Sequence, residues 1–130
     1  MLTEKDKTNL FKEKKCCVVR FFYKRKIMKG LDTLINQADE ILKKYPEVDF
    51  YNAIETAYLL GSRLLFEEQK WNLTVETYLA EIFHSSISDF QKELNKVIAP
   101  DAISDYAKTR WRLVERRKIL IVFRNDLEKI

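Results

Sequence analysis

Apolar residues recur at helical spacing along most of the chain beyond residue 30. Between residues 31 and 45 they fall three or four positions apart, which is the spacing of one face of an amphipathic helix. Lys43 and Lys44 suit the negative end of such a helix, and Pro46 stops it. The pattern therefore predicts a first regular helix over 31–45.

Three further helices are predicted by the same periodicity. Asp49 is a good N-cap for a helix that runs to about Gln69. A third helix covers about 74–98, and Pro100 separates it from a fourth over about 101–127. The predicted breaks are near 46–49, 70–74 and 99–101.

The second of these helices carries apolar residues on more than one face. Phe50, Ile54 and Leu64 form one stripe, and Tyr51, Tyr58 and Leu65 form a neighbouring one. This width predicts a central helix. Gly61 within it costs about 1 kcal/mol relative to Ala, so we expect a close helix crossing there to offset that cost.

The predicted core follows from the apolar faces of the four helices. It consists of Leu34, Ile35, Ala38, Leu42, Ile54, Ala57, Leu64, Leu65, Leu79, Ile82, Phe83, Ile87, Phe90, Leu94, Trp111, Val114 and Ile121.

Two short runs near the ends of the chain fit more than one structure. Cys16–Tyr23 and Ile119–Phe123 are rich in β-branched and aromatic residues, so periodicity alone does not separate a buried strand from a helix. A strand pair made of the two runs is the alternative. Helices are preferred because both runs lie in long segments of Lys, Arg, Glu and Leu without turn residues. The basic segment 1–27 stays open as a separate helix or an extension.

Composition supports helices throughout. The 130 residues include only two Gly and two Pro, whereas a sheet-rich domain needs many tight turns built from those residues. We expect an all-α fold: a single antiparallel bundle of four to five helices with short loops, forming one domain over 1–130.

Residues that could carry chemistry are few. Cys16 and Cys17 are the only cysteines and His84 is the only histidine, so a four-ligand zinc site needs borrowed carboxylates. Glu81 and His84 form one Glu-x-x-His pair, whereas a di-iron bundle needs two. No Gly-rich phosphate loop and no nucleophile with a base and an orienting group are apparent. The sequence predicts a protein that is not an enzyme, with no catalytic residue, metal or cofactor.

Charge is distributed unevenly. Residues 1–29 carry ten Lys/Arg and three Asp/Glu, residues 30–98 carry six and twelve, and residues 99–130 carry eight and five. Basic ends around an acidic middle favour charge balance between neighbouring helices, and we expect the basic groups to be scattered among acidic ones. The alternative is a contact with an anionic partner.

The basic residues of the two ends are the candidates for a nucleic-acid or anion contact. Guanidinium groups pair well with phosphates, and Trp111 between two arginines offers a stacking ring. No helix-turn-helix or RNA-binding signature accompanies them. The candidates are Lys24, Arg25, Lys26, Arg110, Arg112, Arg116, Arg117 and Arg124.

Aromatic content points to a protein partner. The chain has eight Phe, six Tyr and two Trp, and aromatic residues are enriched at interfaces. We therefore expect an interaction module that acts as a regulator, inhibitor or accessory subunit, with nucleic-acid binding as the alternative and a homo-oligomer left open. No run approaches the roughly 18 apolar residues of a membrane span, and a cytoplasmic location is expected.

Overall fold

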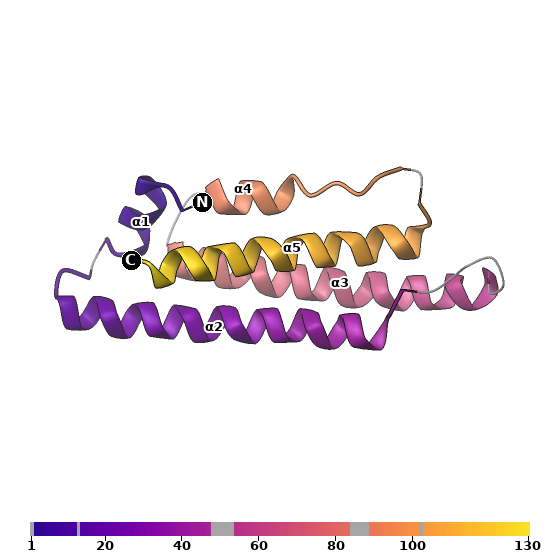
Figure 1. Ribbon diagram of the computed structural model, residues 1–130, viewed down its shortest axis with the longest axis horizontal. Coiled ribbons are helices and arrows are strands. Elements are labelled where there is room, and N and C mark those ends of the chain that lie inside the picture. Colours follow the sequence, from indigo (N-terminus) through magenta and orange to yellow (C-terminus); the bar gives the residue numbers. More distant parts are fainter. Residues whose placement is uncertain (1, 13, 48–53, 84–88, 102) are drawn as a thin grey trace.

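Three long helices lie side by side along the molecule (Figure 1). They are α2 (Cys17–Lys44), α3 (Ile54–Phe83) and α5 (Asp105–Glu128). Two short helices complete the fold, α1 (Glu4–Leu10) and α4 (Asp89–Asn95). The computed structural model describes residues 2–12, 14–47, 54–83, 89–101 and 103–130. The predicted all-α bundle of four to five helices is confirmed, and no strand occurs in these ranges.

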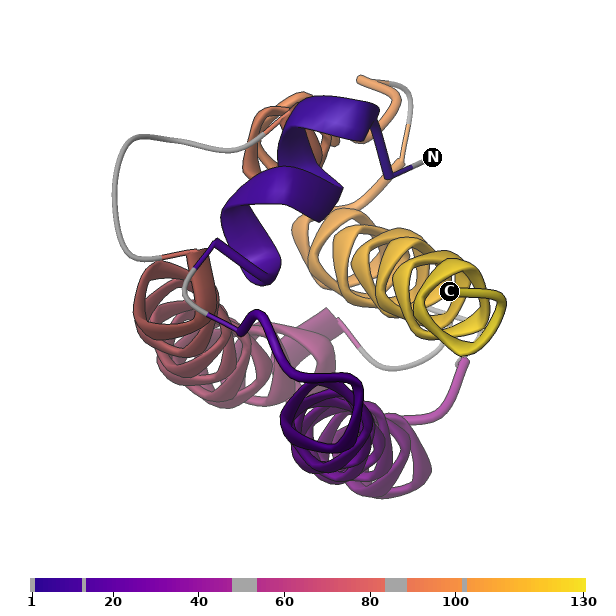
Figure 2. The ribbon, with the colours of Figure 1, turned by 90° about the vertical axis from the view of Figure 1, so that its left-hand side faces the viewer.

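The long helices occupy three corners of the bundle, and α1 and α4 cover the side that faces away from α2 (Figure 2). Helix α2 runs opposite to both α3 and α5, whereas α3 and α5 run in the same direction (Figure 1). This parallel arrangement arises because α4 and the non-helical residues 96–101 carry the chain back along the bundle before α5 begins.

The preference for helices at the two ends is confirmed. Thr3 caps α1 through its Oγ1, which accepts the Asp6 N–H at 3.1 Å. Helix α2 begins at Cys17, well before residue 31, with Cys16 as its N-cap. The first 27 residues thus hold a separate short helix and the start of a long one. The Ile119–Phe123 run lies inside α5.

The predicted break at 70–74 is wrong, because α3 continues through it. The polar residues there satisfy their side chains within the helix instead of capping a new one. Asn72 Nδ2 donates to Glu68 Oε1 at 3.3 Å, and Thr74 Oγ1 donates to the Lys70 carbonyl at 3.0 Å. Trp71 is buried, and its Nε1 donates to the carbonyl of Leu34 in α2 at 2.9 Å.

The predicted helix over 74–98 is also different in the structure. Helix α3 ends at Phe83, and α4 is a separate element that begins at Asp89. The predicted break near 99–101 is present, and α5 begins at Asp105 behind the N-cap Ser104, whose Oγ accepts the Ala107 N–H at 3.2 Å. The predicted start at Asp49 lies outside the described residues.

The core sits between the three long helices. Eight predicted core residues are buried: Leu34, Ile35, Ala38, Leu64, Leu79, Ile82, Phe83 and Leu94. Leu42, Trp111, Val114 and Ile121 are only half-buried, and Leu65 is exposed. The predicted core positions Ile54, Ala57, Ile87 and Phe90 lie outside the described side chains.

The buried face of α5 differs from the predicted one. One row of buried residues repeats every seven positions: Tyr106, Leu113, Leu120 and Leu127. The row between them holds Thr109, Arg116 and Phe123, of which Thr109 and Phe123 are buried. Because two of these three residues are polar, the apolar pattern of the sequence favoured the neighbouring positions Trp111, Val114 and Ile121 instead.

Side chains that donate to backbone carbonyls tie α2 to α3. Tyr23 Oη of α2 donates to the Ile82 carbonyl of α3 at 3.2 Å, and Tyr78 Oη of α3 donates to the Ile27 carbonyl of α2 at 3.2 Å. A methyl group added at Gly61 would meet Tyr106 Cβ of α5 at an ordinary 3.8 Å, so α5 packs close to Gly61 as expected but leaves room for a small side chain.

Candidate interaction surfaces

The arginines of α5 face carboxylates of other segments. Arg112 Nη2 lies 3.0 Å from Glu68 Oε2 of α3, and Arg110 Nη1 lies 3.3 Å from Glu47 Oε1. Two further pairs reach α2, namely Arg117 with Asp39 and Arg124 with Asp32. The expected charge balance between basic and acidic helices is therefore present along α5.

Glu68 is the centre of the most buried of these contacts, with 3% of its surface exposed. Its carboxylate pairs with Arg112 and also with Arg116 Nη1 at 3.4 Å. Arg116 Nε in turn donates to the Leu94 carbonyl at 3.4 Å, just before the end of α4. Burial lowers the pKa of Arg116, and Glu68 opposes that shift. Because Arg116 of α5 contacts both Glu68 of α3 and Leu94 of α4, it links the three helices.

The structure does not gather the eight predicted anion-contact residues into one surface. Lys24, Arg25 and Lys26 lie in the first part of α2. Lys24 Nζ donates to the Glu128 carbonyl at the C-terminal end of α5 at 3.2 Å, a favourable place for a cation. Arg110 lies at the opposite end of α5, where its Nε donates to the Tyr45 carbonyl at 3.1 Å.

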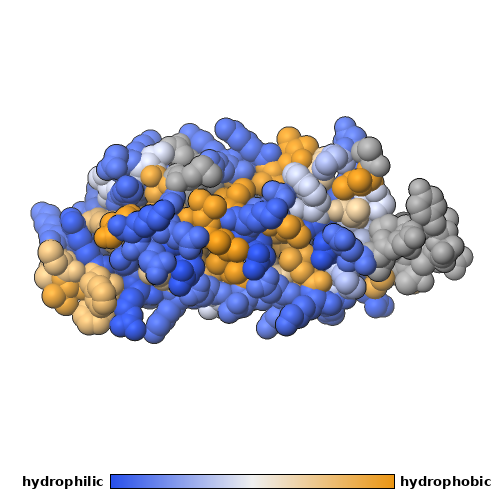
Figure 3. Space-filling model, viewed as in Figure 1, coloured by the Kyte–Doolittle hydropathy of each residue, from blue (hydrophilic) through white to orange (hydrophobic). Residues whose placement is uncertain are grey.

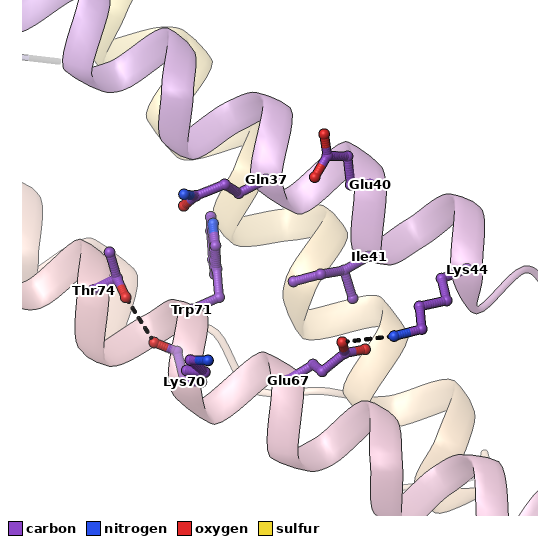
Figure 4. A pocket seen from close by; sticks show the side chains of 8 residues that line it. All are labelled: Gln37, Glu40, Ile41, Lys44, Glu67, Lys70, Trp71 and Thr74. Atoms are coloured by element: carbon purple, nitrogen blue, oxygen red, sulfur yellow. Dashed lines mark hydrogen bonds and ion pairs between the residues drawn. The ribbon is translucent and has the colours of Figure 1, made fainter.

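A groove between α2 and α3 was not predicted from the sequence (Figure 4). It has a volume of about 410 Å³ and is lined by Gln37, Glu40, Ile41, Lys44, Glu67, Lys70, Trp71 and Thr74. Lys44 Nζ lies 3.0 Å from Glu67 Oε1 across it, and this contact raises the pKa of Lys44. The lining holds two acids and two bases, so its formal charge is zero and the groove has no strong preference for a charged ligand.

An apolar ridge runs along the outer face of α3. Its residues are Leu59, Phe66 and Leu73, which repeat every seven positions and are between 61% and 67% exposed. At 100° per residue they lie within one narrow arc, opposite the buried residues Leu64 and Val75. The sequence placed this helix at the centre of the bundle, whereas the helices in the described part of the chain leave this face uncovered.

A second exposed apolar group lies at the start of α2. This α2 tip consists of Val18, Val19, Phe21 and Phe22, which are between 46% and 62% exposed. Cys16 and Cys17 are also exposed there. The backbone N–H groups of Val19 and Val18 stabilise the thiolate and lower the pKa of Cys16.

Metal chemistry gains no candidate from the residues that the structure describes. The described ranges contain no cluster of three or more metal-ligating residues. Within those ranges no helix has the length and apolar character needed to cross a membrane. His84 of the Glu-x-x-His pair lies outside the described residues.

Comparison with known proteins gives no further guide. No protein-family model matches the chain, and neither the curated proteins nor the solved structures contain a significant match.

Proposed function

We propose that the chain is a helical interaction module that binds a helix of a partner protein along the ridge of α3. The observation that carries the proposal is the ridge itself: three large apolar side chains, each more than half exposed, on one line of a long helix. Scattered exposed apolar residues are normal on proteins, but a row aligned along a helix matches the way that helices dock on one another.

The spacing defines the shape of the partner. In a two-stranded coiled coil, apolar side chains at two of every seven positions form the seam, and each packs between four residues of the facing helix. The ridge of α3 supplies one of these two positions in each repeat. Leu59 to Leu73 spans fourteen residues, or about 21 Å of helix at 1.5 Å per residue. A partner helix of about three to four turns would cover it.

The flanks of the ridge define the charge of the partner. Arg63 and Lys70 are exposed and lie beside the ridge on a single side of it, at the same seven-residue spacing. Facing residues of opposite charge at such positions set partner choice in coiled coils. The partner helix is therefore expected to carry acidic residues next to its apolar row. A second copy docked through the same face would bring like charges, so a different protein is favoured.

Nucleic-acid binding stays the alternative function. The arginines of α5 already pair with carboxylates, so a phosphate backbone would have to displace those acids. Binding driven by phosphates weakens steeply with salt, with a log–log slope of about −0.9 per neutralised phosphate on duplex DNA. Fluorescence polarisation with random-sequence DNA at about 50 and 200 mM salt tests this alternative directly.

The proposal is tested with three labelled helical peptides that share one apolar seven-residue repeat. Their flanking positions carry Glu, Gln or Lys. We expect the Glu peptide to bind tightest and the Lys peptide weakest in anisotropy titrations. Phe66→Ser should weaken binding of the Glu peptide by about tenfold or more, because truncating an interface aromatic typically costs more than 1 kcal/mol.

The matched control is Phe22→Ser, since Phe22 is exposed to almost the same extent but lies on α2. This variant should leave peptide binding unchanged. Equal affinity for the three peptides, or an equal loss in the two variants, would contradict docking on the ridge. Light scattering of the free protein adds a check: a dimer lost on Phe66→Ser would show that a second copy covers the ridge.

A further inference from the structure

The α2 tip combines exposed apolar side chains with a local absence of acids. Figure 3 shows apolar surface at the end of the molecule where α2 begins. The rings of Phe21 and Phe22 contact each other edge to face, with centroids 5.8 Å apart. Residues 14–31 contain seven Lys or Arg and no Asp or Glu. An apolar tip within such a basic segment is complementary to a surface that is both apolar and negatively charged.

Three exposed basic side chains follow the tip along one side of α2. We use the name basic collar for Arg25, Lys26 and Lys29, which are all exposed. Together with Phe22 they line a shallow groove of about 340 Å³. Arg25 also lies over the Phe21 ring, with its guanidinium carbon 5.9 Å from the centroid. The groove thus offers an apolar wall and three cations, which suits an anionic phospholipid headgroup whose chains lie beside it.

The order of the residues along α2 fits the depth profile of a bilayer when the tip of the helix points into the membrane. Val18, Phe22, Arg25 and Lys29 share one outward face at spacings of four, three and four. With 1.5 Å per residue, Val18 to Phe22 covers about 6 Å and Lys29 lies about 10 Å further along. Interfacial helices bury their apolar residues about 5–10 Å deep. Apolar residues at the tip would therefore enter the acyl boundary while the basic collar stays among the headgroups.

The carboxylate of Glu128 does not pair with the collar. Glu128 at the end of α5 contacts Lys24 through its backbone carbonyl, and its carboxylate lies 3.4 Å from Arg124. Arg20 Nε donates to the Lys14 carbonyl, and Lys14 Nζ lies over the Tyr23 ring at 5.0 Å. The cations around the tip are thus held by carbonyls and rings, which leave their charge in place.

We propose that the α2 tip and the basic collar form a docking site for a membrane surface rich in anionic phospholipids. A bilayer is favoured over a nucleic acid because Val18 and Val19 have no flat face on which a base could stack. Their only favourable contribution to binding is the burial of apolar surface away from water. A bilayer is also favoured over a protein groove because basic residues occur on both sides of α2 near the tip: Arg20 and Lys24 lie on the side of the helix opposite the basic collar. This site is separate from the ridge of α3, so the two proposals stand or fall independently.

The test is co-sedimentation of the 130-residue chain with large vesicles of phosphatidylcholine alone or with about 30% phosphatidylserine. Binding is expected only to the anionic vesicles and should fall as salt rises. The charge variant is Arg25→Gln, Lys26→Gln and Lys29→Gln combined. Since each cation near an anionic surface is worth about fivefold in partitioning, this variant should lose about a hundredfold.

The tip variant is Val18→Ser with Phe22→Ser, which should weaken binding by at least tenfold while the basic residues are intact. Its control is Leu59→Ser with Phe66→Ser, a pair of comparable exposure on α3, which should bind vesicles normally. The control for charge is Lys43→Gln with Lys96→Gln, both exposed and outside the collar. Circular dichroism of each variant confirms that the helices are retained.

Insertion has its own readout. In a Phe22→Trp variant, fluorescence at position 22 should be quenched by lipids brominated near the headgroup end of the chain, beyond the quenching of the parent protein. Absence of vesicle binding would overturn the proposal, and so would equal losses in the tip and control pairs. Binding without quenching would overturn insertion, and binding of random-sequence DNA but not vesicles would assign the collar to nucleic acid.

Discussion

The phenol of Tyr78 in α3 lies directly against Gly30 in α2. Tyr78 Oη donates to the carbonyl of Ile27, one turn before Gly30, at 3.2 Å. A methyl group at position 30 would overlap the end of the Tyr78 ring. Because Gly30 has no side chain, the Tyr78 ring can pack at this position and reach the backbone of α2.

Replacing Gly30 with Ala tests this relationship. Ala favours a helix over Gly by about 1 kcal/mol, so the substitution would be stabilising at an open position. Here we expect a net loss of about 1–2 kcal/mol, because the displaced ring loses its hydrogen bond and its packing. Urea melts of the purified variant measure the difference.

The sign of the effect should reverse when the ring is removed. In a Tyr78→Ala background, Gly30→Ala should stabilise by about 1 kcal/mol. Gly61→Ala is the matched control in the parent protein, because a methyl group there has ordinary contact distances, and it too should stabilise. Destabilisation of the same size in both backgrounds would show that the cost of Gly30→Ala does not come from Tyr78.

The same tyrosine predicts a dependence of stability on pH. Burial raises the pKa of Tyr78 to about 12 from its ordinary value of 10.0. Below about pH 10 the phenol is protonated in both the folded and unfolded states, so its contribution to stability is complete. As pH rises from about 10 to 12 the unfolded state loses its proton first, and stability falls.

Denaturant melts between pH 8 and 11 should therefore show a decline that is shallower in Tyr78→Phe. The slope should be reduced and not removed, because burial also raises the pKa values of Tyr23, Tyr45 and Tyr106. An absorbance titration at 295 nm provides a second check, since the variant should lack one late-titrating phenol. Identical slopes in the parent and the variant would rule out Tyr78 as a source of the decline.

The sequence specified the helical class well but not the length of each helix. Scarcity of Gly and Pro and the apolar spacing were sufficient for an all-α bundle. The break expected at 70–74 failed because polar Asn72 and Thr74 resemble caps in sequence, while in the structure they bond back into the same helix. The tertiary contact of Trp71 with Leu34, which periodicity does not reveal, helps to hold this segment inside a continuous helix.

The candidate surfaces were harder to predict than the fold. Arg116 lies on the inward face of α5 and pairs there with Glu68, which is distant in sequence. Because a charged residue interrupts the buried row, the apolar pattern did not identify that row as the core face. Leu59 and Phe66 fell within a helix that the sequence indicated to be central, and Leu73 fell within the predicted break at 70–74. Periodicity gives the faces of a helix but not the number of its neighbours. The basic clustering before residue 30 was visible in the sequence, whereas the exposure of Val18 and Phe22 beside it was not.

Two phenylalanines of α3 allow a core position to be compared with a ridge position. Phe83 is buried and contacts Phe123 of α5 edge to face, with centroids 5.9 Å apart. Phe83→Ala should cost about 3–5 kcal/mol in denaturant melts, because it leaves a cavity in the core. Phe66→Ala on the ridge should change stability by no more than about 0.5 kcal/mol. Similar losses at both positions would mean that the ridge packs within the chain.

The contacts of Glu68 predict a large effect from removing one charge. Glu68→Gln leaves Arg116 and Arg112 without their carboxylate partner. Since the arginine side chains keep 17% and 25% exposure, water offsets part of the penalty, and we expect a loss of about 2–4 kcal/mol. The control is Glu115→Gln, whose pair with Lys118 lies at the surface and should matter by less than about 0.5 kcal/mol.

A compensated variant distinguishes the charge from the packing at this position. Changing Glu68 and Arg116 together to Met removes their ion pair and keeps most of its volume, while Arg112 loses its carboxylate partner but keeps its hydrogen bond to Thr109 Oγ1. This double variant should recover more than half of the loss seen in Glu68→Gln, because no guanidinium at position 116 is then left without a partner. A further loss in the double variant would show that packing around Glu68, and not the unpaired arginine, sets the cost.

The thiol of Cys16 gives a chemical test of the conformation of the α2 tip. The N–H groups of Val19 and Val18 lower the pKa of Cys16 only while the first turn of α2 is formed. A Cys17→Ser variant has a single thiol, and its rate of alkylation by iodoacetamide follows the fraction of thiolate, which is the reacting form. This rate should reach half of its maximum at a lower pH in the folded protein than in the urea-unfolded chain. Anionic vesicles that cover the tip should slow this alkylation, whereas phosphatidylcholine vesicles should not. A folded protein whose midpoint equals that of the urea-unfolded chain would show that α2 does not begin at Cys17 in solution.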